Sequence, residues 1–350
     1  MYVPVACLPP RFGNLYGGSA VMNVLMLRFN EHIFGRSVGL VLAGLLAAMS
    51  GGCTHKSLDS CPAVTDDLHV AFGWDAEAVA LPEGMAVFFY PQQGSGYWRY
   101  DLPPEGGHVA VPRNRYDVII YNNDTDAMLF EGTGSFATAS VTTRQGNLSD
   151  GVAALYTGAE PPHSHEAADE PVRQQPNQLW VCAAANVDAT HATDSITLTP
   201  APAVATYRIT VTDITNLGSV SQMSMSLSGL AAGLRFADRV PLTTAVTVPG
   251  SLSQTSPTSA VGTMLTFGSA ASANHLCLYF WLRDGQKKVV DFDVSTQIAS
   301  APDPMDVAIT VSGVELPEVE TSPGGNPGSG SGIDVGVDNW DYVVIELSPL

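Results

Sequence analysis

The sequence predicts an all-β protein built from two tandem antiparallel β-sandwich domains. Many short segments alternate apolar and polar residues, as expected for strands that bury one face. Clusters of Gly, Pro and Asn separate these segments at short intervals, which is typical of strand-turn-strand structure. Only 14% of the residues are charged, and the chain beyond the first 52 residues is rich in Thr, Ser and Val. This composition favours secreted β structure over helices.

The N-terminal β-sandwich is expected over residues 68–194. Its first strand is the clearest, because Leu68, Val70, Phe72 and Trp74 alternate with less apolar residues. A Pro-, Glu- and His-rich loop is expected between its last two strands. The predicted strands of this domain cover residues 68–74, 85–90, 97–102, 108–111, 116–121, 128–131, 137–143 and 178–185.

The C-terminal β-sandwich is expected over residues 195–350. Residues 275–282 are apolar on both faces, as expected for a central strand that is covered on each side. A Gly-, Ser- and Pro-rich stretch, residues 322–332, precedes the last strand. The predicted strands cover residues 205–214, 223–230, 244–248, 261–267, 275–282, 289–294, 307–314 and 340–347.

Residues 1–52 are interpreted as a lipoprotein signal segment. Arg28 and Arg36 precede a short apolar run, and Ser50-Gly51-Gly52 then leads to Cys53. A basic flank, an apolar stretch and small residues make a secretory signal, and the run is shorter than the roughly 20 residues of a spanning helix. A Cys directly after small residues suggests the bacterial lipobox, so lipid attachment is predicted at Cys53. The alternative is an ordinary signal peptide cut nearby, which would leave that thiol free.

The start of the chain is longer than a signal requires, because such signals usually have about 15–30 residues. Residues 1–21 resemble neither signal nor fold, so translation is expected to begin at Met22 or Met26. After cleavage, residues 53–67 would form a polar tether. Two acyl chains would hold the protein firmly at the outer membrane and the cell surface.

Charge and cysteine content exclude several functions. The net charge of −19 repels phosphate backbones, so nucleic acid is not an expected partner. Apart from Cys53 and the signal, the chain contains Cys61, Cys182 and Cys277, with no Cys-x-x-Cys or Cys/His metal spacing. Cys182 and Cys277 lie in apolar runs, and we expect two buried, unpaired thiols.

Two polar clusters contain residue types that can bind metal ions. His163-Ser164-His165-Glu166, with Asp169 and Glu170, could bind a divalent metal, but a solvated loop is the preferred interpretation. Asn122-Asn123-Asp124, with Asp126, could suit calcium, but a turn with left-handed Asn or Asp geometry is preferred. No metal or other cofactor is therefore predicted. The sequence also contains no Gly-x-Ser-x-Gly, phosphate-binding Gly loop or His-Glu-x-x-His, so an enzyme is not expected.

An aromatic cluster, Tyr97, Trp98 and Tyr100, has two interpretations. Surfaces that bind carbohydrates often stack sugars on such rings. However, Trp98 and Tyr100 lie two residues apart and share one face of a strand. Core packing is the preferred interpretation.

Several motifs follow one another along the chain: Gly84-Met85-Ala86-Val87-Phe88-Phe89-Tyr90-Pro91, residues 116–125, Tyr207-Arg208-Ile209-Thr210-Val211, Asn216-Leu217, residues 227–230 and residues 333–340. In this order they resemble the fimbrillin-like lipoproteins of the Bacteroidetes type V pilus system, which include minor-fimbria anchor subunits. The resemblance covers residues 68–347. It implies transthyretin-like sandwiches, a lipoprotein precursor and a structural or adhesive role in a pilus, with other pilus subunits as partners.

One departure from the family pattern concerns assembly. Polymerising members lose their first strand after cleavage at an Arg, and a strand of a neighbour fills the groove by β-strand addition. Between Cys53 and Arg99 this chain has no Arg, and Lys56 is the only Lys. A subunit that keeps its first strand and its lipid suits a pilus base or an accessory position. The alternative is a surface glycan-binding lipoprotein outside any pilus.

Overall fold

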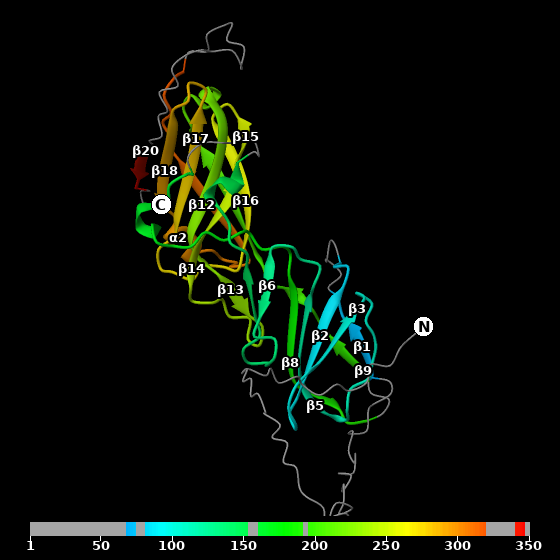
Figure 1. The fold of residues 1–350 in the computed structure, drawn as a ribbon. Coiled ribbons are helices and arrows are strands. Elements are labelled where there is room, and N and C mark those ends of the chain that lie inside the picture. The colour runs from blue at the N-terminus through cyan, green and yellow to red at the C-terminus, as the bar shows by residue number, and fades with distance from the viewer. Residues whose placement is uncertain (1–67, 75–80, 153–159, 192–194, 320–339, 347–350) are drawn as a thin grey trace, which may run out of the picture. The chain divides into compact units, whose positions relative to one another are not determined.

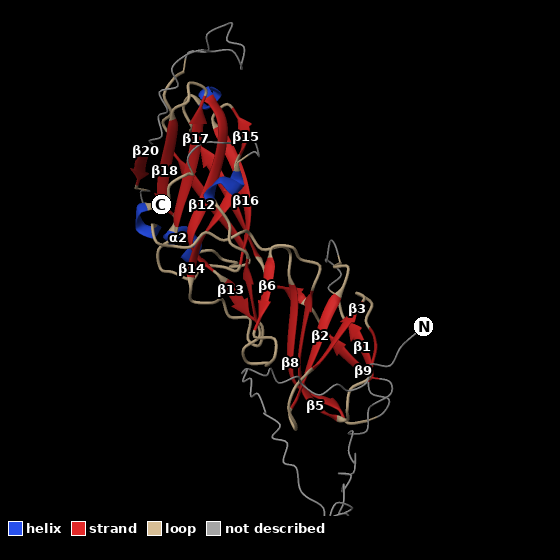
Figure 2. Ribbon diagram, viewed as in Figure 1, coloured by secondary structure: helices blue, strands red, loops and turns tan. Residues whose placement is uncertain are grey.

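The structure, a computed structural model, describes residues 68–74, 81–152, 160–191, 195–319 and 340–346. Strands make up most of these residues, and the helices are short (Figures 1 and 2). The predicted all-β class with tandem sandwiches is confirmed. The signal segment, Cys53, the tether and Cys61 lie outside the described residues. No helix in the described part of the chain has the length and apolar character needed to cross a membrane.

The N-terminal sandwich packs a three-stranded sheet against a five-stranded one. Alternate residues such as Leu68, Val70 and Phe89 are buried between them. The first sheet has the order β4-β1-β9, made of β4 (Gly107–Val109), β1 (Leu68–Phe72) and β9 (Ser195–Leu198). The second has the order β10-β8-β5-β2-β3, made of β10 (Ala201–Pro202), β8 (Trp180–Ala189), β5 (Asn114–Asn122), β2 (Met85–Pro91) and β3 (Trp98–Leu102).

The five-stranded sheet is covered on both faces, which explains its long apolar runs. Residues 85–90 of β2 are all buried. On the face away from β1, Phe88 and Tyr121 pack beneath a third sheet with the order β13-β7-β6. This sheet consists of β13 (Gly233–Arg235), β7 (Ser140–Thr143) and β6 (Met128–Glu131). Phe236, next to β13, is fully buried in the same cluster.

The C-terminal sandwich pairs a four-stranded sheet with a five-stranded one around the largest apolar cluster. The first has the order β15-β16-β11-β19, made of β15 (Ser253–Ser256), β16 (Ser259–Thr266), β11 (Ala205–Thr212) and β19 (Asp306–Ser312). The second has the order β14-β12-β17-β18-β20, made of β14 (Ala245–Ser251), β12 (Val220–Ala231), β17 (His275–Leu282), β18 (Lys287–Asp293) and β20 (Asp341–Ile345).

Strand β17 determines what lies on each face of its sheet. Leu276, Leu278 and Phe280 point into the sandwich core, whereas Cys277 and Tyr279 belong to a separate buried cluster on the outer face. The predicted central strand with two covered faces is therefore confirmed. The short helices are η1 (Leu148–Gly151), η2 (His165–Ala167), η3 (Leu217–Ser219) and α2 (Ser295–Ala299).

The topology differs from a purely antiparallel arrangement in three places. The pairs β1/β9, β11/β19 and β18/β20 are parallel. Each joins segments far apart in sequence, because parallel neighbours need a long connection and cannot form a hairpin. The predicted boundary between residues 194 and 195 stays a prediction. Beyond it, β9, β10 and β13 pair with strands of the N-terminal half.

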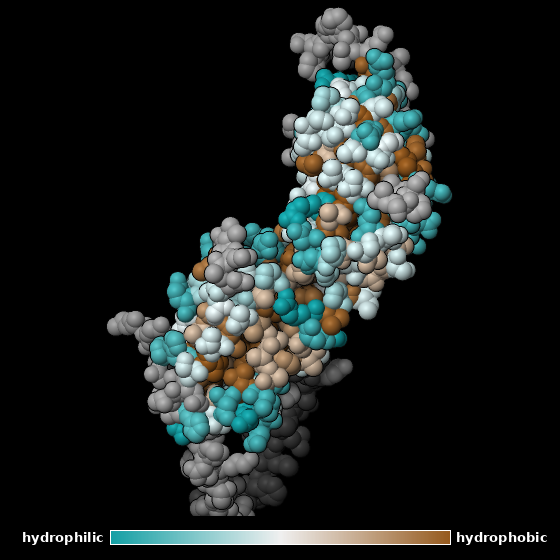
Figure 3. Space-filling model, turned by 180° about the vertical axis from the view of Figure 1, so that it is seen from behind, coloured by the Kyte–Doolittle hydropathy of each residue, from teal (hydrophilic) through white to brown (hydrophobic). Residues whose placement is uncertain are grey.

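The surface is mostly polar on the face shown in Figure 3. Apolar side chains there form small groups between hydrophilic ones. Small apolar groups of this kind are ordinary for a surface in contact with water.

Candidate functional site

Residues 160–177, which we call the strap, lie between β7 and β8 of the N-terminal half but pack on the C-terminal sandwich. The Glu170 carboxylate accepts hydrogen bonds from the Gly229 N–H, at 3.2 and 3.0 Å, and from the Thr247 hydroxyl at 3.0 Å. Thr247 also exchanges two backbone hydrogen bonds with the strap, at 3.0 and 3.1 Å. The strap therefore occupies the free edge of β14.

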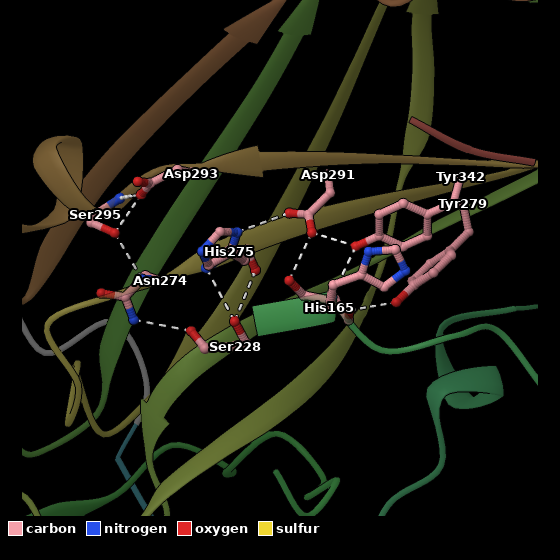
Figure 4. A network of polar contacts seen from close by, with 11 residues as sticks. His165, Ser228, Asn274, His275, Tyr279, Asp291, Asp293, Ser295 and Tyr342 are labelled. Carbon is pink, nitrogen blue, oxygen red and sulfur yellow. Dashed lines mark hydrogen bonds and ion pairs between the residues drawn. The ribbon is translucent and has the colours of Figure 1, made fainter. Parts of the chain in front are cut away.

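A buried carboxylate, Asp291, is the centre of a polar network on the outer face of this sheet (Figure 4). It accepts hydrogen bonds from the Ser164 hydroxyl at 2.7 Å and from the Tyr342 hydroxyl, and its other oxygen lies 3.1 Å from His275 Nδ1. Burying a carboxylate is costly unless several hydrogen bonds compensate. The three partners come from the strap, β20 and β17, so the carboxylate holds these three elements together.

Tyr342 attaches the last described strand to the strap. Its hydroxyl accepts a hydrogen bond from the His165 N–H at 3.1 Å, and the two rings stack at 3.9 Å between centroids. Burial, then nearby Cys277 and the bond to Asp291, raise the pKa of Tyr342 above its ordinary value. The hydroxyl therefore stays protonated at neutral pH and can donate to the carboxylate.

Tyr279 and Cys277 complete the buried outer face. The Tyr279 hydroxyl donates to the Pro162 carbonyl at 2.8 Å and lies 2.8 Å from the Ser226 hydroxyl. Burial raises the pKa of Tyr279 well above its ordinary value, and burial likewise raises the pKa of the Cys277 thiol. A thiol that stays protonated is a poor nucleophile. The network is therefore suited to holding the strap and β20 in place.

The two outer edges formed by β20 and β19 differ. Strand β20 pairs on one side with β18, and among the described residues no strand pairs with its other side. Its Val344 is 59% exposed. On β19, the Gln297 side-chain amide donates to the Thr310 carbonyl at 2.9 Å and accepts from the Thr310 N–H at 2.8 Å. One amide thus occupies both backbone groups of Thr310, near the middle of this edge.

The first strand, β1, lies at the centre of its sheet. It pairs antiparallel with β4 and parallel with β9. Leu68 and Val70 are 1% and 0% exposed. Just beyond the strand, the Trp74 ring N–H donates to the Pro104 carbonyl at 2.7 Å. The position between β4 and β9 is therefore filled by the chain's own first strand.

The residues weighed as a divalent-metal site have separate partners. Ser164 bonds Asp291, His165 stacks on Tyr342, and Glu170 binds backbone and hydroxyl groups of the C-terminal sandwich. Within the described ranges, no group of three or more His, Cys, Asp or Glu is placed to hold a metal. The prediction of a solvated loop is wrong for Ser164, which is 2% exposed, because it donates to a buried carboxylate.

The segment weighed as a calcium site closes a turn by side-chain bonding. Asn122 donates to Asp124 at 2.8 Å and to the Gln178 carbonyl at 3.1 Å, and accepts from the Trp180 N–H at 2.7 Å. None of residues 122–126 has a positive φ, so the prediction of left-handed geometry is wrong. Asn122 extends β5 and fixes it to the start of β8.

The aromatic cluster is divided between two faces of β3. Trp98 and Tyr100 pack against the N-terminal core, as predicted, and the Trp98 and Tyr116 rings meet edge to face at 5.8 Å. Tyr97 lies on the opposite side and is 44% exposed. Cys182 is half-buried, Cys277 is buried, and both are unpaired.

Sequence reasoning missed Asp291 and Tyr342 as a pair. A signal for Asp291 was present, because an acidic residue interrupts the apolar run Val289-Val290-Asp291-Phe292. A charge at such a position needs a partner. Its partners come from segments 51 and 127 residues away, which no local pattern could identify.

Comparisons with known proteins find relatives that are named as fimbrial or adhesin proteins. The chain is 35% identical to a candidate fimbrium anchoring subunit, Fim4B, of Bacteroides ovatus over 101 residues. This match covers 28% of this chain and 29% of that protein. A candidate adhesin from Bacteroides ovatus matches with a TM-score of 0.58 and 21% identity, over 77% of this chain and 99% of that one. The fimbrial anchor protein Mfa2 of Porphyromonas gingivalis matches with a TM-score of 0.44 and 10% identity, over 70% and 90% of the two chains.

The match to the anchoring subunit confirms the predicted resemblance to fimbrial proteins, and the match with a TM-score of 0.58 shows a shared fold. The match to the anchoring subunit spans less than a third of that protein's length. The family assignment rests on a longer match, because the sequence profile of a domain of unknown function, DUF5119, covers residues 52–250. This is more than half of the chain, which therefore belongs to the DUF5119 family.

Proposed function

We propose that the protein is a structural or adhesive subunit of a cell-surface pilus, held at the outer membrane by lipid on Cys53. The similarity to a candidate fimbrium anchoring subunit supports a fibre role. The Asp291 network supports a structural role over an enzymatic one, because its polar groups bond one another and its thiol stays protonated. Partners would be other pilus subunits, joined by β-strand addition.

Within the pilus, we propose a base or accessory position for this subunit. The observation that carries this proposal is the burial of β1 at the centre of its own sheet, with Leu68 and Val70 almost wholly inaccessible. Full burial of each such side chain stabilises by roughly 1.5–3 kcal/mol, so spontaneous loss of the strand is unfavourable. The lipid would then remain covalently joined to the folded domain.

N-terminal sequencing of the surface-assembled protein tests the proposed position. We expect the mature chain to begin at Cys53, upstream of β1. A terminus beyond Trp74 would mean that β1 has been removed and that the subunit polymerises as part of the stalk. Cleavage at Lys56 would release the lipid but leave β1 in place. That result would contradict anchoring by lipid and would leave the retention of β1 unchallenged.

Lipid attachment is tested separately. A palmitate analogue supplied to growing cells should label the wild-type protein and leave Cys53→Ala unlabelled. Cys182→Ala is the matched control, since that thiol lies within the folded N-terminal sandwich. Equal labelling of wild type and Cys53→Ala would refute the lipid assignment while leaving the pilus role open.

A further inference from the structure

An open pocket of about 400 Å³ lies on the N-terminal sandwich, on the side of β3 opposite its core-facing residues. We call it the Tyr97 pocket. Phe88 and Tyr121 stack with centroids 5.5 Å apart, and Tyr121 and Phe130 stack at 4.2 Å, which builds an aromatic wall. The Tyr97 ring lies 5.7 Å from Phe88 and 5.9 Å from Tyr90 while remaining 44% exposed. Tyr97 is thus a solvent-facing ring held by buried rings.

Arg99 and Asn123 line the same pocket, and both bond Asp101, which lies beside it. Arg99 Nη2 lies 2.9 Å from Asp101 Oδ1, and Asn123 Nδ2 donates to the same oxygen at 2.9 Å. The second oxygen of Asp101 has no hydrogen bond to any residue that the structure describes. The carboxylate is 58% exposed, so this oxygen remains available as an acceptor. Donors and an acceptor therefore lie within one small area.

A buried hydroxyl lines the same pocket without a partner. Thr125 Oγ1 is inaccessible to solvent and makes no hydrogen bond within the described part of the chain. Leaving such a group unpaired costs about 1–3 kcal/mol. A ligand hydroxyl could remove this cost only if Thr125 turned toward the pocket that it lines.

The combination of groups indicates the class of ligand. An exposed ring offers a flat apolar surface to the C–H face of a sugar, and the Asp, Asn and Arg groups match its hydroxyls. The Arg99–Asp101 pair is electrically neutral, and the chain carries a net charge of −19, so anionic ligands are disfavoured. We propose that the Tyr97 pocket binds a neutral saccharide. This site is independent of the pilus role.

The full-length protein, released from membranes with detergent, can be tested on immobilised glycans. The probes are neutral oligomers of glucose, mannose, galactose and N-acetylglucosamine, alongside sialylated and sulfated glycans. We expect binding to a neutral probe, reduced about tenfold by Tyr97→Ala and by Asn123→Ala, as one lost ring contact or hydrogen bond to a ligand predicts.

Two variants serve as controls. Tyr97→Phe keeps the ring and should bind within about threefold of wild type, a difference of under 1 kcal/mol. Val240→Ala alters an exposed side chain, 46% accessible, that does not line the pocket. Absence of binding to every neutral probe, tighter binding to the anionic probes, or wild-type binding by both Tyr97→Ala and Asn123→Ala would overturn the proposal.

Discussion

Replacing Tyr342 by Phe removes one hydroxyl from the Asp291 network and leaves the rest of the side chain in place. The hydroxyl donates to the buried carboxylate and accepts from the exposed His165 backbone. Water can replace the second interaction, because it lies at the surface. The ring remains and can still stack on the His165 imidazole.

The expected loss of stability follows from the charge of the acceptor. A hydrogen bond to an ionised group contributes roughly 1.5–3 kcal/mol, and Asp291 would keep only Ser164 and His275 as partners. We expect Tyr342→Phe to lower the free energy of docking β20 by that amount. The amides of β20 that bond to β18 should then exchange hydrogen about 10- to 100-fold faster than in wild type.

Hydrogen exchange measured by mass spectrometry on β20 peptides, together with urea unfolding, tests this expectation. Tyr97→Phe is the matched control, because it deletes the same atom from an exposed ring. Ser164→Ala should show non-additive loss with Tyr342→Phe, since both hydroxyls donate to Asp291 Oδ2. If Tyr342→Phe leaves hydrogen exchange in β20 unchanged, and the stability losses of the two variants simply add, then Asp291 does not hold β20 and the strap together.

Two further predictions concern the folded state as a whole. Burial, the largest cause in each case, raises the pKa values of Tyr121 and Tyr207 from 10.0 to about 12, so unfolded tyrosines ionise first. The contribution of these tyrosines to the free energy of unfolding should be fully present below pH 10. It should fall between about pH 10 and 12, by up to roughly 2–3 kcal/mol per tyrosine. Tyrosinate absorbance and circular dichroism measure this loss, and an unfolding free energy that stays constant over this range would contradict it. Gly229→Ala should destabilise by more than about 1 kcal/mol, because φ is +73° and a Cβ would strike the Ala273 carbonyl. Gly218→Ala, which meets nothing within 4 Å, should leave the urea midpoint almost unchanged, and equal effects would contradict this assignment.

Local patterns were sufficient for the strands that bury side chains in alternation. The bounds predicted for residues 128–131 and 275–282 coincide with β6 and β17. Strand β15 was missed because its four residues are all polar and mostly exposed. Strand β9 alternates Ile196 and Leu198 with polar residues, but it was missed because four residues after a polar stretch give too short a pattern. Strand β13 has only three residues and forms because β7 offers an edge contributed by a distant part of the chain.

The candidate site was less predictable than the fold. In the strap, His163 and His165 suggested a metal site from the sequence. In the structure, Ser164 and Glu170 act there as hydrogen-bonding groups. The sequence placed Tyr97 in one aromatic cluster with Trp98. Its exposure could not be predicted, because it depends on which face of the five-stranded sheet the Tyr97 ring packs against. Such outcomes depend on tertiary partners, and local sequence carries no record of them.

Gln297 limits the number of places at which this molecule can be extended. Its amide saturates Thr310 on β19, while the strap fills the edge of β14. The backbone groups of Thr310 and Thr247 are therefore not free to pair with another strand, which lowers the tendency to edge-to-edge aggregation. The two edges of the five-stranded sheet are therefore unequal, because the strap bonds β14 whereas no described strand pairs with the outer side of β20. A strand added to this sheet would therefore have to pair with β20, which gives such a contact a defined direction.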